Sequence, residues 1–459
     1  MQYHHSLRHV FALTLAAFLF TTCDKDPREA AKFPRADQGS EEHRVSELAH
    51  IELENGISVY LQEEQADEQV AIEVFYRAGF IHEPSGQTQV SHVTEHLVVH
   101  SATKSYQPDE AMDRVSTYGA IAAEAIGDCS HFDYIVPADK LDEVLAIEAE
   151  RLTTIKFHTD VLAAEAKRAS AEIDRILASE SSSLSRFSMM TLNQVINYGA
   201  TFVPIYNSAF DITTGDIESF HNAFYRPDDM VIILIGGFDM ADGERLVRKH
   251  FEGIERRPTP PVPTKTVPAA GDITVNWDIK SEVVYLVYPG PYGDFKERLT
   301  MTIFGSFLRR YISDSPSMRL VATTSYVTNP VYPVRDLPFF VYAENQENNP
   351  VGELRIELTR MAEGAVEALN ATIWPRLVTN VKSFVNATMI RNTGVYIPRR
   401  NLIGQEALNV GLKHMFREGM SNDEFFALLD SITFEEAIAT IEKHVNHDNM
   451  RRVTLKGRE

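Results

Sequence analysis

The chain has 459 residues, of which 44% are hydrophobic, so it is long enough for two or more globular domains of ordinary size. Its formal net charge is −21, and it contains no dense basic run with interleaved aromatic residues. This composition argues against nucleic acid as a partner.

The N-terminus, residues 1–23, has the pattern of an export signal. An apolar run from Val10 to Phe20 is too short for a comfortable membrane span, and it is followed by Cys23 in a sequence similar to a bacterial lipoprotein box. Simple secretion and an uncleaved anchor are the alternatives. The polar residues 24–45 are typical of a flexible tether. We therefore expect a protein of the bacterial periplasm that touches the membrane only through an N-terminal lipid anchor.

In the first half of the chain, a block of helices lies between two strand regions. Residues 47–76 are strand-like, with a turn at Asn55 and Gly56, and the apolar stretch from Met230 to Phe238 is typical of a strand covered on both faces. Helical patterns lie between them, at about 88–100, 108–118, 140–154 and 160–177.

A proline-rich segment divides the chain into two similar parts. Residues 256–268 contain five prolines, which favours an extended linker between a module at 46–255 and a module at 269–459. The second part repeats the order of the first, with strands near 273–279 and 282–290, a helix at about 299–312, a strand near 338–346 and long helices. We predict an α+β protein of two homologous α/β modules, each a mainly antiparallel sheet covered by helices.

The sequence "VSHVTEHLVVH" contains the motif that points to chemistry. On a helix, His92 and His96 lie on one face and can bind one cation, and zinc suits such ligands. Glu95 is placed to act as general base on a water at the same ion. The alternative is a helix that binds no metal and whose histidine side chains form only hydrogen bonds within the protein. The second half of the chain has no such motif.

A second helix can supply the third ligand. Glu165 and Glu172 are seven residues apart, two turns on one face, so one can bind metal while the other serves as an acid or base group. Taken alone, this pattern favours a solvated face on which Arg168 pairs with both carboxylates.

Together these motifs resemble the pitrilysin/insulinase family of zinc peptidases, which includes the mitochondrial processing peptidases. The similar segments are "LENGISVYL", "YRAGFIHEPSGQTQVSHVTEHL" and "FHNAFYRPDDMVIILIGGFD", and the resemblance covers about residues 46–459. It implies one zinc ion per chain, held by His92, His96 and Glu172, with Glu95 as catalytic base and Glu165 as an acidic residue beside the site.

The resemblance also implies how substrate is bound. The family pairs two such chains, so we expect a homodimer or a heterodimer with a related subunit, and peptides that bind as an added strand. Arg319 and Tyr326 match the pair that holds the substrate carbonyl; a surface arginine and a sheet tyrosine are the alternative. The chain departs from the family at several positions. Ala123 replaces the usual substrate-binding asparagine, Gln89-Val90-Ser91 replaces a Gly-Leu-Ala before the first histidine, and Ala102-Thr103 replaces a Gly-Thr after the helix.

The leading hypothesis is a zinc endopeptidase or oligopeptidase that hydrolyses peptides or unfolded segments outside the cytoplasm. A non-catalytic interaction or scaffold subunit with the same fold is the alternative, and Ala123 favours it slightly. A third reading is a protein that binds zinc and peptide with negligible turnover.

Overall fold

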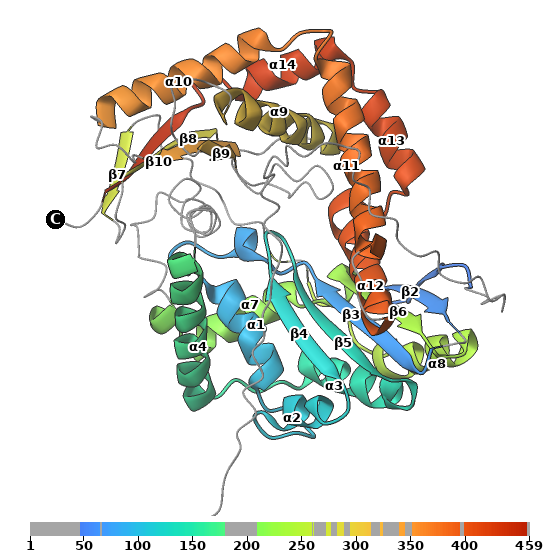
Figure 1. Ribbon diagram of the computed structural model, residues 1–459. Coiled ribbons are helices and arrows are strands. Elements are labelled where there is room, and N and C mark those ends of the chain that lie inside the picture. Colours follow the sequence, from blue (N-terminus) through green and yellow to red (C-terminus); the bar gives the residue numbers. More distant parts are fainter. Residues whose placement is uncertain are drawn as a thin grey trace, which may run out of the picture. The chain divides into compact units, whose positions relative to one another are not determined.

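A computed structural model shows two mixed sheets, each covered by helices (Figure 1), which confirms the predicted α+β class. The structure describes residues 46–64, 67–179, 209–258, 260, 272–276, 282–288, 294–313, 322–324, 339–344, 351–394 and 399–456. The export signal, the tether and most of the proline-rich linker lie outside these residues, so they and the module boundaries remain predictions.

The first sheet has six strands in the order β1-β2-β6-β3-β5-β4. The β2–β6 pair is parallel and the other pairs are antiparallel. The predicted turn joins β1 to β2, where Gly56 has φ +92°, a left-handed conformation that glycine adopts without strain. The strands are β1 (Ala49–Glu52), β2 (Ser58–Glu63), β3 (Gln69–Tyr76), β4 (Ala120–Ala125), β5 (Ser130–Pro137) and β6 (Met230–Gly236).

The second sheet repeats five strands of the first in the same order, β7-β11-β8-β10-β9. Its one parallel pair, β7–β11, occupies the place of β2–β6, and the remaining pairs are antiparallel. This shared topology supports an internal repeat. The strands are β7 (Asp272–Asn276), β8 (Val283–Tyr288), β9 (Ala322–Thr324), β10 (Phe339–Glu344) and β11 (Arg451–Lys456).

Helices of the first half cover one face of the first sheet. Along β3, Val70, Ile72 and Val74 point into this core, which they share with buried residues of α1, α3 and α4. Helix α1 contacts α4, α7 and the edge strand β4. The elements are η1 (Phe80–His82), α1 (Val90–His100), α2 (Glu110–Ser116), η2 (Ala138–Lys140), α3 (Leu141–Thr153), α4 (Thr159–Ser179), η3 (Ala209–Asp211), α7 (Thr214–Phe224), η4 (Pro227–Asp229) and α8 (Met240–Phe251).

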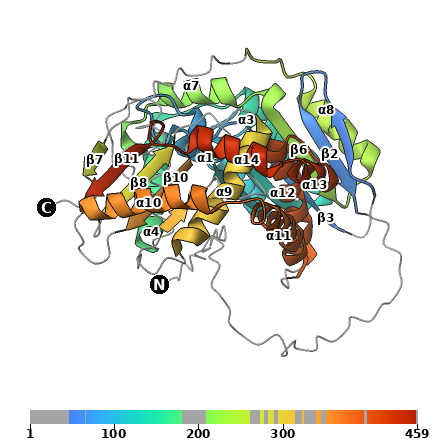
Figure 2. The same cartoon turned by 90° about the horizontal axis from the view of Figure 1, so that it is seen from above.

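In the second half, α9 follows β8 as α1 follows β3, and it packs beside α10, as Figure 2 shows. Trp374 at the start of α11 is buried in this core and donates its indole N–H to the carbonyl oxygen of Ile432 at 2.9 Å. The helices are α9 (Phe295–Ser313), α10 (Val351–Ala368), α11 (Trp374–Gly394), α12 (Arg399–Arg417), α13 (Asn422–Asp430) and α14 (Phe434–His444).

The other face of the first sheet is covered by α12, which contacts β3, β5 and β6. Two glycines let this helix approach closely: a Cβ on Gly411 would lie 2.0 Å from the ring of Phe75, and one on Gly404 would lie 3.0 Å from Ile135. A segment near the C-terminus therefore completes the burial of the N-terminal sheet.

A buried polar network joins α3, β5 and α1. Arg151 donates to the Glu148 carboxylate at 2.7 Å and to the carbonyl oxygen of Val99 at 3.2 Å, and the Tyr134 hydroxyl also contacts Glu148. The side chains of Glu148 and Arg151 are 0% and 2% exposed. The network therefore fixes the C-terminal end of α1 against the sheet.

Replacing Glu148 with alanine is expected to lower the free energy of unfolding by about 3–5 kcal/mol, because it leaves the Arg151 charge buried and unpaired. Urea denaturation measures this change. Glu143→Ala on the same helix is the matched control, since Glu143 pairs with the exposed Arg114 and should have a much smaller effect. Equal effects of the two substitutions would contradict the prediction.

Among the described residues, no helix is both long enough and apolar enough to cross a membrane.

Candidate metal and catalytic site

Helix α1 presents two histidines on the side that faces away from its core contacts. Val90, Val93 and Leu97 are fully buried and anchor the helix to the core. His92 and His96, four residues apart, lie one turn apart on another face, with ring centroids 4.9 Å from each other. The spacing read from the sequence thus produces the expected pair of imidazoles.

Helix α4 lies beside α1 (Figure 1), and its residue Glu172 lies near both histidines. The Oε2 atom of Glu172 is 3.9 Å from Nε2 of His92 and 3.6 Å from Nε2 of His96. Ligands bound tetrahedrally to zinc at about 2.0–2.2 Å lie roughly 3.3–3.5 Å apart. Two imidazoles and one carboxylate are also a donor set that zinc takes in hydrolases, so these residues fit a zinc ion.

A polar contact at Nδ1 orients the imidazole ring of each histidine. Nδ1 of His96 lies 3.1 Å from Oε2 of Glu165, and Nδ1 of His92 lies 3.2 Å from Oε1 of Gln89. Each of these oxygens can accept an N–H, which leaves Nε2 of each ring to a metal. Glu165 also pairs with Arg168, but it is buried, whereas the sequence alternative had placed both carboxylates on a solvated face.

The charges of the site favour a cation. Burial lowers the pKa of His96, but its hydrogen bond with Glu165, the nearby Glu172 carboxylate and the charge of Glu95 outweigh burial and raise the pKa to about 10. The nearby imidazoles of His92 and His96 lower the pKa of Glu172. Without metal, a proton on the imidazole therefore balances the carboxylates, and a zinc ion can replace that proton.

Glu95 has the surroundings of a general base. The residue lies on α1 next to His96 and is 7% exposed. Its pKa is raised to about 7, mainly by burial; the charge of His96 lowers the pKa, and the negative charges of Glu172 and Glu124 raise it. A carboxyl group whose pKa lies near neutrality can both take and return a proton at physiological pH.

Two residues that hold the start of α1 in place were not predicted from the histidine motif. Gln89 has φ +74°, the left-handed conformation that explains the family's glycine at this place, and its side chain contacts His92. Glu83 is fully buried and accepts hydrogen bonds from Ser91 N and Oγ at 3.2 and 2.6 Å. The strained backbone at Gln89 was detectable only as a departure from the family sequence.

His100 was also missed. Its Nε2 lies 3.9 Å from Glu165 and its Nδ1 lies 2.6 Å from Asp109. The signal was present in the sequence, because His100 extends the i, i+4 series of His92 and His96 by one more turn.

Only one of the positions linked to substrate binding lies within the described residues. Ala123 lies on β4, an edge strand of the first sheet, and it packs against the first core. Arg319 and Tyr326 lie outside the described residues, so their assignment remains a prediction.

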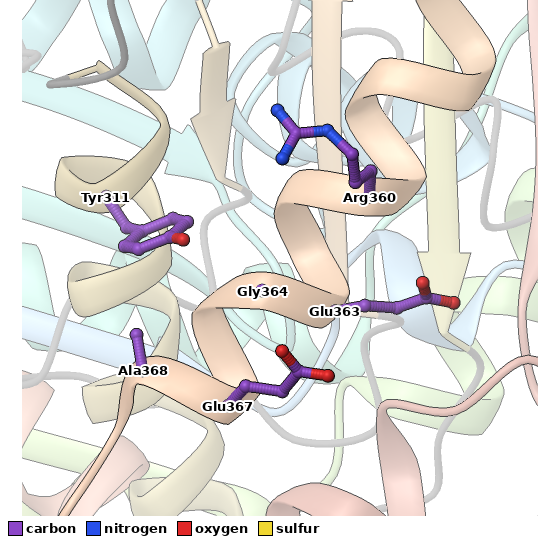
Figure 3. A pocket seen from close by; sticks show the side chains of 6 residues that line it. All are labelled: Tyr311, Arg360, Glu363, Gly364, Glu367 and Ala368. Carbon is purple, nitrogen blue, oxygen red and sulfur yellow. The ribbon is translucent and has the colours of Figure 1, made fainter.

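A cavity of about 460 Å³ lies elsewhere, between α9 and α10. Figure 3 shows that Arg360, Glu363 and Glu367 extend from one helix and Tyr311 from the other. None of its lining residues belongs to the group around Glu172, so this cavity is unconnected with the metal chemistry.

Comparison with protein families gives two adjacent matches. The family described as Insulinase (Peptidase family M16) matches residues 58–202, and the Peptidase M16 inactive domain matches residues 211–325. The first match contains the histidines of α1 and Glu172. Together the two matches cover more than half of the chain.

Similar proteins include a curated zinc protease, PqqE, from Helicobacter pylori, which is 24% identical over 219 residues. The match covers 47% of this chain and 49% of that protein, so it spans about half of the relative. The crystal structure of a protease from Helicobacter pylori has a TM-score of 0.68 at 17% identity and covers 90% of this chain and 100% of that one. The first half of the periplasmic protease PqqL from Escherichia coli has a TM-score of 0.59 at 14% identity, with coverages of 89% and 91%.

Proposed function

Since the chain belongs to the insulinase (M16) family of peptidases, we propose that it is a zinc-dependent endopeptidase or oligopeptidase that hydrolyses peptides or unfolded segments. The observation that carries the proposal is the meeting of His92 and His96 on α1 with Glu172 on α4, since these three side chains from distant parts of the chain could hold one metal ion. A scaffold subunit has no need of this set.

Each residue then has a distinct role. His92, His96 and Glu172 would hold the ion, which would acidify an adjacent water and polarise the substrate carbonyl. Glu95 takes the proton from the attacking water and gives it to the leaving amine. Glu165 assists by holding Nδ1 of His96, so that the other nitrogen of the ring faces the metal.

The edge strand β4 supports a mode of substrate binding. Strand β4 ends the sheet, so its outer main-chain groups can pair with an extended peptide, and it contacts α1, which carries Glu95. Main-chain pairing of this kind gives limited sequence selectivity. Ala123 lacks the amide of the family's asparagine, so we expect weaker substrate binding here rather than loss of the ligands.

Assembly and location are further parts of the proposal. We propose a homodimer or a heterodimer with a related subunit, in which Arg319 and Tyr326 of the second half hold the substrate carbonyl. We also propose action in the periplasm from a lipid anchor at Cys23. The signal-like N-terminus supports this location, and one structural relative is described as a periplasmic protease.

Chelation tests the proposal. Purified protein is expected to contain zinc and to cleave a quenched peptide; dialysis against a chelator should abolish both, and added Zn²⁺ should restore cleavage. Zinc and peptide binding without product would favour the non-enzymatic binding protein. Zinc-free protein with no cleavage after Zn²⁺ addition would favour the scaffold subunit.

A further inference from the structure

A second group of metal-binding side chains lies on the opposite face of the first sheet. On β3, Ala71 and Phe75 belong to the cluster that contains α12, and Glu73, between them, points the same way. On β5, His131 is the register partner of Phe75 and stacks on its ring at 4.9 Å, and Asp133 is the register partner of Glu73. Adjacent strands thus bring one imidazole and two carboxylates together.

These three side chains are close enough to share one ion. Their ligand atoms lie within 4.8 Å of one another. Nδ1 of His131 is hydrogen-bonded to Oδ1 of Asp133 at 2.6 Å and lies 3.9 Å from Oε2 of Glu73. A shared cation would replace the proton of this hydrogen bond and move the first pair apart to the spacing of metal ligands. The other ring nitrogen, Nε2, lies 3.7 Å from Glu124 on β4. Glu124 can therefore orient the ring through Nε2, as Glu165 does for His96 through Nδ1.

Glu73 has an unsatisfied atom that points to a missing ligand. Its side chain is almost fully buried, with 2% of the residue exposed. Its Oε2 has no hydrogen-bond partner within the described part of the chain, although it faces the His131 ring. A buried carboxylate oxygen without a partner is costly, and a bound cation is one way to satisfy it.

The charges in this group are also unbalanced. Glu73, Asp133 and Glu124 surround a single imidazole, so with every group ionised the formal charge is −2. Like charges directly opposite on paired strands destabilise a sheet. Burial, and then the charge of Asp133, raise the pKa of Glu73 well above its ordinary value, so a retained proton is the competing way to reduce this charge. That proton would lie in a hydrogen bond between Glu73 and Asp133, and a bound cation would take its place.

We propose that Glu73, His131 and Asp133 bind a second divalent transition-metal cation, with Zn²⁺ or Mn²⁺ as the chemistry that suits two carboxylates and an imidazole. The ion links β3 and β5 beneath α12. It can enter past Asp133, whose side chain is 26% exposed. This site is separate from the one formed by His92, His96 and Glu172, and it does not depend on peptidase activity.

Equilibrium dialysis of the full chain with Zn²⁺ tests the proposal in a background that lacks the first site. The H92A/H96A double variant is expected to retain one zinc ion per chain by elemental analysis, and adding Glu73→Gln should weaken the binding of that ion at least tenfold. Glutamine has the shape of glutamate without its charge, so the fold is expected to persist. Asp133→Asn is a second variant with the same expected loss.

Glu52→Gln, at an exposed position on β1, is the matched control and should leave binding unchanged. No zinc bound to the double variant, or equal affinity with and without Glu73→Gln, would overturn the proposal and leave the proton as the partner of Glu73. If only the site of His92, His96 and Glu172 does not bind zinc, the number of zinc ions per chain is lower in the wild type but unchanged in the H92A/H96A variant. The two failures can therefore be told apart.

Discussion

Replacing Glu95 with glutamine is expected to reduce kcat for peptide cleavage by about 10³-fold while zinc content stays unchanged. Glutamine keeps the shape of the side chain but cannot take a proton from water, and general bases typically contribute 10²–10⁴-fold. Because Glu95 is buried and the ligands lie on the neighbouring positions of α1, the isosteric change leaves His92 and His96 in place.

The pH profile gives this prediction a second readout. A carboxyl group with a raised pKa keeps its proton to higher pH, so the base form of Glu95 accumulates as pH rises through about 7 in the metal-free protein. A nearby cation moves that midpoint downward. In the wild type, kcat should therefore rise with pH on the acidic side of its profile, as Glu95 loses its proton. The residual activity of the Glu95→Gln variant should lack this rise.

The matched control for this experiment is Glu110→Gln, which removes an exposed carboxylate from the adjacent helix α2. It should leave kcat and zinc content at their wild-type values. A Glu95→Gln variant that binds zinc and cleaves within threefold of the wild type would remove Glu95 from the mechanism and place the base elsewhere.

Helix positions were predictable because their periodicity is local. The patterns at 88–100 and 160–177 became α1 (Val90–His100) and α4 (Thr159–Ser179). The strands β4 and β5 were not predicted. The sequence "AIAAEA" of β4 is rich in alanine, which has low strand propensity, and β5 contains the buried polar residue His131. Pairing with neighbouring strands overrides these local preferences.

Residue spacing in the sequence predicted one part of the candidate site and not the other. The positions of His92 and His96 follow from helix geometry alone. The approach of Glu172, 76 residues after His96, depends on how α4 packs against α1, and only the resemblance to a known family predicted it. The group of Glu73, His131 and Asp133 depends on the register of β3 against β5, which no local pattern specifies.

Replacing Glu172 with glutamine is expected to weaken zinc binding by at least about 100-fold and to abolish cleavage. A neutral amide is a poorer ligand than a carboxylate, and loss of a ligand should exceed the 10–100-fold effect typical of residues that only orient ligands. The side chain of Glu172 is 37% exposed, so the substitution should be tolerated by the fold. Metal-competition titration measures the affinity.

Glu165→Gln separates the two roles on α4. Its carboxylate contacts Nδ1 of His96 and not the proposed ion, so zinc affinity should fall by about 10–100-fold, less than for Glu172→Gln. Lys167→Gln, exposed on the same helix, is the control without effect.

If Glu172→Gln bound zinc as tightly as the wild type, the third ligand would be another group, and Glu165, which also lies beside the His96 ring, would be the first alternative to test. The order of the two glutamate variants thus decides which carboxylate of α4 holds the metal and which one orients the histidine.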